Sequence, residues 1–211
     1  MRSDLPEFDE LNNIKTTLSE MLATDTSDTI ENPRGYADRK HLEDTIFELI
    51  TMGYVYGVEV AGLDFDQDFP VSRERMFESA NRPTKGETFR ERIEHHLDEY
   101  EASPKDEAAT EKLVNQLAVV AETETHRTIN EGGYEAAERY AEDHPGVTVY
   151  KTWETMQDDK VRDEHEELQG ATVPLDARFY SWTGDSALRP GDFMSPELNI
   201  NCRCLLRYTT R

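Results

Sequence analysis

The chain has 211 residues, a length that can bury one substantial hydrophobic core or two modest ones. Hydrophobic residues make up 36% of it, with nine Tyr, eight Phe and two Trp, which argues against a wholly disordered acidic chain. The formal net charge of -22 has the wrong sign for a protein whose whole surface neutralises nucleic-acid phosphates.

The acidic surface is poor in lysine, with 7 Lys beside 16 Arg. Molar salt shortens the Debye length to about 3 Å and removes most of the self-repulsion of such a surface. We therefore expect a halophilic host cytoplasm. The charge is also uneven, because residues 1–145 carry net -19 and residues 146–211 carry net -3. Contacts with other macromolecules are expected mainly in the C-terminal part.

Neither a secretory signal nor a membrane anchor is predicted. No basic segment followed by an apolar run opens the chain, and the most apolar run, residues 49–63, is too short for a bilayer that needs ~20 residues. Cys202 and Cys204 are the only cysteines, which argues against a secreted disulfide framework. We expect an intracellular protein without a membrane partner.

Helical spacing of apolar residues dominates the first part of the chain. A helix is predicted over residues 11–22, followed by a polar linker that ends at Asn32-Pro33. A second helix is predicted from residue 37 to about residue 60. Gly53 and Gly57 within it indicate either close packing or a break, and the pattern alone leaves both alternatives open.

Two further helices are predicted, and the residue types that follow them change from helix-forming to strand-forming. The helices cover residues 89–100 and 107–130, the second stopped by Gly132-Gly133 and followed by a short helix to about residue 143. Beyond residue 146, β-branched and aromatic residues predict short strands around one helix. The strands are expected near residues 147–150, 172–173, 179–182 and 205–208, and the helix over 159–168.

The predicted fold class is therefore α+β, with a mainly helical N-terminal part followed by a small strand-and-helix C-terminal unit. The predicted domains are residues 1–105, a helical region of unassigned role, and residues 106–211. Within the second domain, helices extend to about residue 145 and the small α+β unit follows.

An ordered set of short motifs lies in the second domain. In chain order these are a Thr-Glu pair on a helix, a Lys-x-Trp strand, an Asp-x-x-Val-Arg-x-x-His segment, a glycine, and a closing Asn-Cys-Arg-Cys. The residues are Thr123, Glu124, Lys151, Trp153, Asp158, Val161, Arg162, His165, Gly170, Asn201, Cys202, Arg203 and Cys204. This series resembles the phage Mu F-like minor head domain of tailed viruses, over roughly residues 110–211. One departure is Glu122, where the family usually carries a basic residue.

The resemblance implies a minor capsid protein required for head morphogenesis. Members of this family are present in few copies, associate with the portal vertex, enter during procapsid assembly and are implicated in DNA packaging or delivery. The expected partners are the portal protein, the major capsid protein or inner capsid, and packaged DNA. The expected location is the virion head.

The Cys-x-Cys segment and a preceding histidine form a candidate metal site. In an extended strand Cys202 and Cys204 point to one face, and His165 is expected on a helical face shared with Asp158 and Arg162. Two thiolates and an imidazole are zinc ligands, with Asp158, His144 or water as the fourth. A packed, hydrogen-bonded cluster and an oxidised cysteine pair are the alternatives.

Other candidate residues carry positive charge or large rings. Arg162 and Arg203 could bind carboxylate or phosphate groups, or form internal ion pairs with Asp158 or Glu124. Both tryptophans are expected to be core anchors. The tail contributes a small basic stripe that is the candidate DNA contact, formed by Arg203, Arg207 and Arg211.

Catalysis is not expected. His165 begins a segment like the helix of zinc proteases, but Gln169 stands where the second histidine is needed. Phosphate-binding, nucleophile-elbow and dinucleotide motifs are also missing from the sequence. The alternative function is a metal-dependent hydrolase or transferase-like enzyme that uses Glu124 and His165. We expect binding to other virion components instead.

Overall fold

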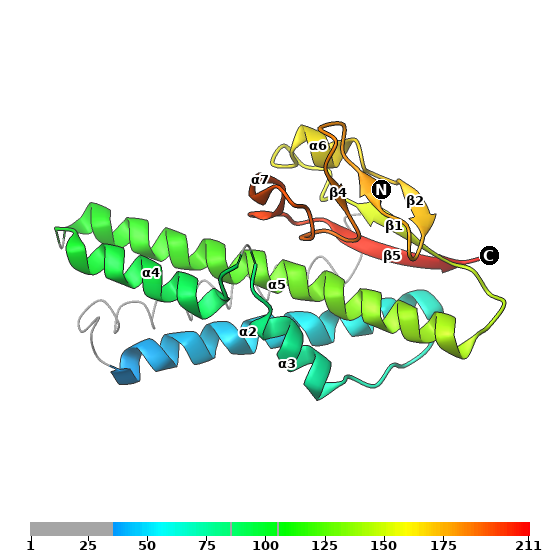
Figure 1. Cartoon of the computed structure of the whole chain (residues 1–211), viewed down its shortest axis with the longest axis horizontal. Helices are drawn as coiled ribbons and strands as arrows, with labels where there is room; N and C mark the ends of the chain where they lie inside the picture. The colour runs from blue at the N-terminus through cyan, green and yellow to red at the C-terminus, as the bar shows by residue number, and fades with distance from the viewer. Residues whose placement is uncertain (1–35, 85, 105) are drawn as a thin grey trace. The chain divides into compact units, whose positions relative to one another are not determined.

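The computed structural model describes residues 36–84, 86–104 and 106–211. Four long or medium helices come first, and five strands with two short helices follow (Figure 1). The helices are α2 (Tyr36–Phe65), α3 (Arg73–Asn81), α4 (Phe89–Ala102) and α5 (Glu107–Asp143). The later elements are β1 (Val149–Glu154), α6 (Asp163–Glu166), β2 (Thr172–Pro174), β3 (Phe179–Tyr180), β4 (Ser186–Ala187), α7 (Pro196–Asn199) and β5 (Leu205–Thr210). The predicted α+β class is confirmed, while the predicted helix over residues 11–22 and the linker after it lie outside the described residues.

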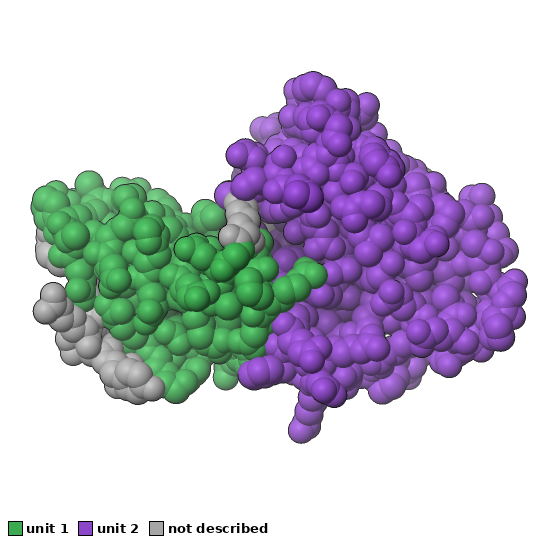
Figure 2. All heavy atoms as spheres, in the orientation of Figure 1, with its two compact units in different colours: residues 1–49, 81–122 green, residues 50–80, 123–211 purple. Residues whose placement is uncertain are grey.

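The chain divides into two compact units, which Figure 2 colours separately. Unit 1 consists of residues 1–49 and 81–122, and unit 2 consists of residues 50–80 and 123–211. Helices α2 and α5 each contribute residues to both units. The domain boundary expected between residues 105 and 106 remains a prediction.

Helix α4 in unit 1 forms where the sequence predicts it. The Thr88 side chain accepts from the backbone of Glu91, and the Glu91 carboxylate accepts from the backbone of Thr88, a capping box that fixes the first turn. The apolar stripe of the helix is buried together with apolar side chains of α2 and α5. This core contains Phe89, Ile93, Leu97, Tyr100, Leu42, Ile46, Leu113 and Leu117.

Helices α2 and α5 pack closely in unit 2, at their glycines. A Cβ atom on Gly57 would lie 1.9 Å from the carbonyl oxygen of Ile129, and one on Gly132 would lie 2.1 Å from that of Tyr54. Glycine therefore permits a backbone contact that any side chain would block. Close packing is the outcome for the glycines of α2, while the prediction that Gly132-Gly133 ends its helix is wrong, since α5 runs on to Asp143.

Helix α2 passes a test for membrane spans that uses only length and composition. The segment Arg39–Phe65 is long and apolar enough to cross a membrane. The helix extends well beyond the apolar run at residues 49–63 that was identified in the sequence. However, 56% of its most apolar window is buried inside the structure, and the core helix of a soluble protein passes the same test. The test is therefore weak evidence for a membrane segment.

The strands form a three-stranded antiparallel sheet in the order β2-β1-β5 and a separate β3-β4 hairpin. On the central strand β1, Val149, Lys151 and Trp153 alternate with more exposed residues and point into the core. The sheet lies against the C-terminal half of α5 (Figure 1), where the Asn130 amide donates to the carbonyl of Cys204 and accepts from the backbone N–H of Leu206.

Two local predictions for this region are wrong. The helix expected over residues 159–168 shrinks to α6, because Arg162 has an extended backbone conformation as the residue before its first turn. Trp182 was expected in the core but is 66% exposed. It lies in the turn of the β3-β4 hairpin, where Ser181 and Asp185 pair through their backbones, and the described residues leave most of the ring uncovered. Trp153, by contrast, is fully buried as predicted.

Candidate functional site

The residues of the candidate metal site come together in unit 2. His165 on α6 lies with its Nδ1 atom 3.4 Å from Sγ of Cys204 and 3.7 Å from Sγ of Cys202. The three ligand atoms all lie within 4.8 Å of one another, and the side chains are buried. The sequence therefore correctly predicted which residues meet, although the cysteines lie in the extended segment before β5 rather than within the strand.

These distances match the geometry of a tetrahedral zinc site. With zinc bonds of about 2.3 Å to sulfur and about 2.05 Å to nitrogen, two ligands at the tetrahedral angle stand about 3.6 Å apart. The observed separations lie on either side of that value. The cluster could therefore hold a metal ion. A hydrogen-bonded cluster without metal fits the same contacts, because Nδ1 of His165 and the thiol of Cys204 can both donate to the sulfur of Cys202.

The two thiols are electrostatically different. Hydrogen bonds from Cys204 and from His165 hold the pKa of Cys202 well below its ordinary value of 9.0, although burial opposes the shift. Interaction with Cys202, together with burial, raises the pKa of Cys204 well above that value. Both cysteines are free thiols, so the oxidised pair is not the state of this structure. One thiolate is already favoured before any metal enters.

Two of the expected fourth ligands are engaged elsewhere. Asp158 receives two hydrogen bonds from the guanidinium of Arg203, at 2.6 and 2.7 Å, and this bond lowers the pKa of its carboxyl to about 2. The expectation that Asp158, Arg162 and His165 share one helical face is wrong, since α6 starts only at Asp163. The His144 ring stacks on Tyr140 at the end of α5.

The motif residue Glu124 belongs to a buried ion-pair network. Its carboxylate accepts from Arg127 at 2.8 Å, and both side chains are almost completely buried. Arg127 also donates to Glu131 and to the carbonyl of Ser79, and Glu131 accepts from Arg189. The internal pairing expected for Glu124 is thus present, but its partner is Arg127 rather than Arg162 or Arg203.

Other motif residues fix the ends of the Asn-Cys-Arg-Cys segment and of the β1 strand. The Thr123 hydroxyl accepts from the backbone N–H of Asn201 at 3.2 Å, which ties α5 to the segment that carries the cysteines. Gly170 has a positive φ of 77°, and its N–H donates to the carbonyl of Trp153 at 2.8 Å. Arg162 donates to the carbonyl of Ile200. These motif residues therefore connect elements of unit 2 to one another.

The arginines of the predicted DNA stripe also have protein partners. Besides the pair of Arg203 with Asp158, the Nε atom of Arg207 lies 2.9 Å from the Asp64 carboxylate. The same carboxylate accepts from the backbone N–H of Tyr208 at 2.8 Å. The guanidinium of Arg211 lies over the Tyr150 ring, 5.0 Å from its centre. DNA contact through this stripe remains a prediction.

Sequence reasoning gave no separate role to several polar residues that organise the site. Lys151 is fully buried, and its Nζ atom donates to the carbonyl of Leu188 and lies over two aromatic rings. Asn130, Arg127 and Asp64 were likewise assigned no role, although each bonds across elements. In the sequence, the one signal for these residues was that they are polar and lie within or beside predicted apolar stripes.

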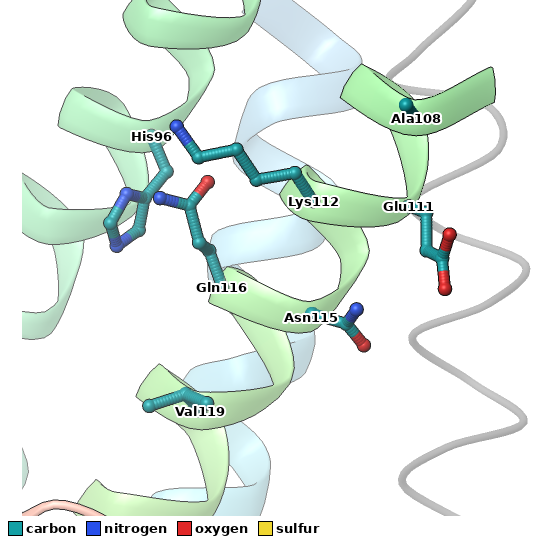
Figure 3. Close-up of a pocket in the computed structure, with 7 residues that line it drawn as sticks. All are labelled: His96, Ala108, Glu111, Lys112, Asn115, Gln116 and Val119. Carbon is teal, nitrogen blue, oxygen red and sulfur yellow. The ribbon is translucent and has the colours of Figure 1, made fainter.

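A separate surface pocket lies between α4 and α5 in unit 1 (Figure 3). Lys112 and Gln116 point toward His96, whereas Glu111 and Asn115 point to the other side of α5. Lys112 and Gln116 also contact the Glu99 carboxylate. No residue of the sequence motif lines this pocket.

Fold and motif together define a small α+β unit held by a Thr-Glu helix, a Lys-x-Trp strand and a terminal Cys-Arg-Cys segment. The chain belongs to the family described as Phage Mu protein F like protein, which matches residues 78–207. The resemblance predicted from the motif is confirmed. The match begins about 30 residues earlier than the motif alone indicated and includes α4 and all of α5.

Two curated relatives were compared. Minor head protein GP7 of Bacillus phage SPP1 is 32% identical over 90 residues, which are 43% of this chain and 28% of that protein. NAD(+)--arginine ADP-ribosyltransferase EFV of Enterococcus faecalis is 34% identical over 98 residues, which are 45% of this chain and 19% of that protein. The chain thus spans less than a third of the length of either relative. No solved structure matches significantly.

Proposed function

We propose that this chain is a minor head protein of a tailed virus that docks at the portal vertex or inner capsid. There it assists head assembly, DNA packaging or DNA delivery. The observation that carries the proposal is the family match over residues 78–207, and the partial similarity to a relative named as a minor head protein supports it. The proposed location is the virion head, and the proposed partners are the portal protein and the major capsid protein.

The contacts within unit 2 support a docking role. Ion pairs and side-chain-to-backbone bonds join α2, α5, β5 and the Cys-Arg-Cys segment, so the unit can present a surface of fixed shape. A rigid surface loses less conformational entropy when a partner binds. The buried Glu124–Arg127 pair explains the motif glutamate as part of this framework.

We propose the β3-β4 hairpin and the neighbouring loop as the docking surface. Tyr180 is 69% exposed, Trp182 is 66% exposed and Met194 is 85% exposed. Met194 lies beside the hairpin because its backbone N–H donates to the Asp185 carboxylate. Exposed apolar and aromatic side chains that gather on a charged protein mark contact surfaces. The occupant we propose is the portal protein.

The test is capture of the portal protein from infected lysate in molar salt, with the captured band identified by its sequence. The wild-type chain is expected to retain the portal protein. The double variant Trp182→Ala, Met194→Ala is expected to lose most of it, because large exposed aromatic and thioether groups would be removed from the interface centre. Leu63→Ala is the matched control, since Leu63 is 69% exposed but lies on α2.

Either of two results would contradict the docking proposal. The wild-type chain could fail to capture any virion protein in high salt and also fail to sediment with virions. Alternatively, the double variant and the Leu63→Ala control could capture equal amounts of portal protein, which would place the interface elsewhere on the chain.

We propose further that zinc occupies the cluster of His165, Cys202 and Cys204. The donor set of two thiols and one imidazole suits zinc better than magnesium or calcium, which prefer oxygen ligands. The bound metal would join α6 to the segment before β5 and stabilise the docking unit. Protein purified without chelators is expected to carry about one equivalent of zinc, and less than a tenth of an equivalent would rule the site out.

DNA contact is a finer part of the proposal and has its own test. Arg203 and Arg207 would contribute by exchanging their carboxylate partners for DNA phosphates, and Arg211, which lies over the Tyr150 ring, by direct phosphate contact. Replacement of all three by Ala should lower the affinity for DNA and reduce its salt dependence. An unchanged affinity would exclude this stripe as the DNA contact.

The transferase-like alternative is favoured by one observation, the partial similarity to the ADP-ribosyltransferase. That similarity covers 19% of the relative, and Glu124 is buried and paired in this chain. We therefore propose a non-catalytic role for Glu124. Transfer of ADP-ribose to arginine by the wild-type chain, lost in Glu124→Gln, would overturn this part of the proposal.

A further inference from the structure

The proposed zinc site has three ligands from the chain, and the structure describes no fourth one. Among the described residues, only His165, Cys202 and Cys204 gather as a group of metal-binding side chains. Asp158 is held by Arg203 in a two-pronged ion pair, and His144 accompanies Tyr140 on α5. Zinc sites with a purely structural role almost always have four protein ligands, whereas sites with three keep a position for water or another ligand.

A small pocket adjoins the cluster in unit 2. Its lining includes the three cluster residues together with Lys160, Arg162 and Asn201. Its cavity volume is ≈ 10 Å³, close to the roughly 10–15 Å³ that one water molecule requires. The ligand position next to the sulfur and nitrogen atoms therefore has room for the donor atom of one small ligand, and the remainder of that ligand can extend toward solvent because the pocket is partly open.

The charge of this pocket favours an anionic donor. Lys160, Arg162 and Arg203 contribute three cationic side chains to its lining, and Asp158 neutralises Arg203. Lys160 and Arg162 are the two further cationic side chains in the lining, beside a site whose two thiolates, imidazole and divalent metal ion would together carry no net charge. A hydroxide or another small anion at the fourth position would be stabilised by these two charges.

We propose that the metal in this cluster is bound by three protein ligands and by a fourth, exchangeable ligand that enters from the pocket. In the isolated protein this ligand is water or hydroxide, and small anions can replace it. The inference rests on the zinc proposal above and adds to it the open coordination position. It does not depend on which virion protein the chain contacts.

Cobalt substitution of the full-length protein tests the proposal. Cobalt(II) takes the place of zinc and reports its ligands by visible absorption, with a thiolate-to-metal band from the cysteines. Addition of azide should change the visible bands and leave the thiolate band in place, because azide replaces water without displacing sulfur. Sulfate salts should be used so that chloride does not compete for the same position.

Two variants serve as controls for the protein ligands that the structure places elsewhere. Asp158→Asn and His144→Ala should both show the wild-type cobalt spectrum before azide and a shift of the visible bands after it, and Asp158→Asn should need less azide because its Arg203 is no longer neutralised. A spectrum that ignores azide would overturn the proposal. So would a spectrum that either variant changes before azide is added, since that residue would then be the fourth ligand.

A second measurement uses only the wild-type protein and therefore does not depend on the folding of any variant. X-ray absorption at the zinc edge should give two sulfur atoms at about 2.3 Å and two lighter atoms at about 2.0–2.1 Å, with scattering from a single imidazole. Scattering from two imidazoles would overturn the proposal. Failure to bind either metal would remove the zinc proposal as well, while portal capture would still decide the docking function separately.

Discussion

Replacement of Lys151 by Met should change how the stability of unit 2 depends on pH. Lys151 is fully buried on β1, and no carboxylate of the described residues bonds to its Nζ atom. Burial, with the nearby Arg189, lowers its pKa from 10.5 to about 7. The folded state therefore binds fewer protons than the unfolded state between about pH 7 and 10.5. The free energy of unfolding is therefore lowest below about pH 7, where Lys151 is charged in the folded state, and it increases as the pH rises from about 7 to 10.5.

The size of this effect follows from the shift. One pKa unit corresponds to about 1.36 kcal/mol, so the charged amine destabilises the folded state by at most about 5 kcal/mol at low pH. Between pH 7 and pH 10, the free energy of unfolding of the wild type should rise by roughly 3–4 kcal/mol relative to Lys151→Met. The difference between the two proteins cancels the other titrating groups that they share.

Urea unfolding followed by tryptophan fluorescence is a suitable assay, because Trp153 lies in the same core. It would be measured at several pH values from 6 to 10 in constant salt. Lys160→Met is the matched control, because Lys160 is exposed. The free energy of unfolding of this variant should stay within about 0.5 kcal/mol of the wild-type value from pH 6 to pH 10. The difference in free energy of unfolding between wild type and Lys151→Met could prove equally independent of pH. That result would refute the assignment of Lys151 as a buried amine without a carboxylate partner.

Three further outcomes are expected. Gly57→Ala should destabilise the protein by about 2 kcal/mol or more in urea unfolding, because the added Cβ would meet the Ile129 carbonyl. Helix preference alone predicts a gain of about 0.5–1 kcal/mol, and that result would contradict the close α2–α5 contact. Glu124→Gln should cost roughly 3 kcal/mol in the same assay by removing the charged partner of buried Arg127, and a neutral result would show that the pair is not structural. The wild-type melting temperature should rise by about 2–4 °C between 0.1 M and 2 M salt for each kcal/mol of repulsion that screening removes from the net charge of -22. A flat profile would argue against high-salt adaptation.

The sequence predicted the fold class and the residues of the metal cluster for identifiable reasons. Apolar spacing in α4 is regular, so this helix was found within a few residues of both ends, and the start of α5 at Glu107 was found in the same way although its predicted end at residue 130 was too early. Cys202 and Cys204 stand two residues apart in an extended segment, a spacing that places their side chains on one face whatever the surrounding fold. His165 was assigned to the cluster through the family motif. In the structure its Nδ1 atom lies 3.7 Å from the sulfur of Cys202 and 3.4 Å from the sulfur of Cys204.

Other features depend on tertiary contacts that a local pattern does not contain. Gly132-Gly133 has the composition of a helix end, but the neighbouring backbone of α2 requires glycine there and the helix continues. Trp182 resembles a core residue by type, although it lies in a hairpin turn and is 66% exposed among the residues that the structure describes. The pairs of Arg207 with Asp64 and of Asn130 with β5 join residues more than 70 positions apart, which spacing rules cannot predict.

Those last two pairs govern how unit 2 can meet other proteins. Strand β5 lies at the edge of the sheet, and edge strands with free backbone groups recruit strands from other chains. Here the Asn130 amide occupies the N–H of Leu206 and the carbonyl of Cys204, and the Asp64 carboxylate occupies the N–H of Tyr208. The opposite edge, β2, is only three residues long and ends in Pro174. Among the described residues, the sheet therefore offers little template for the strands of another chain, which favours side-chain surfaces as the means of recognition.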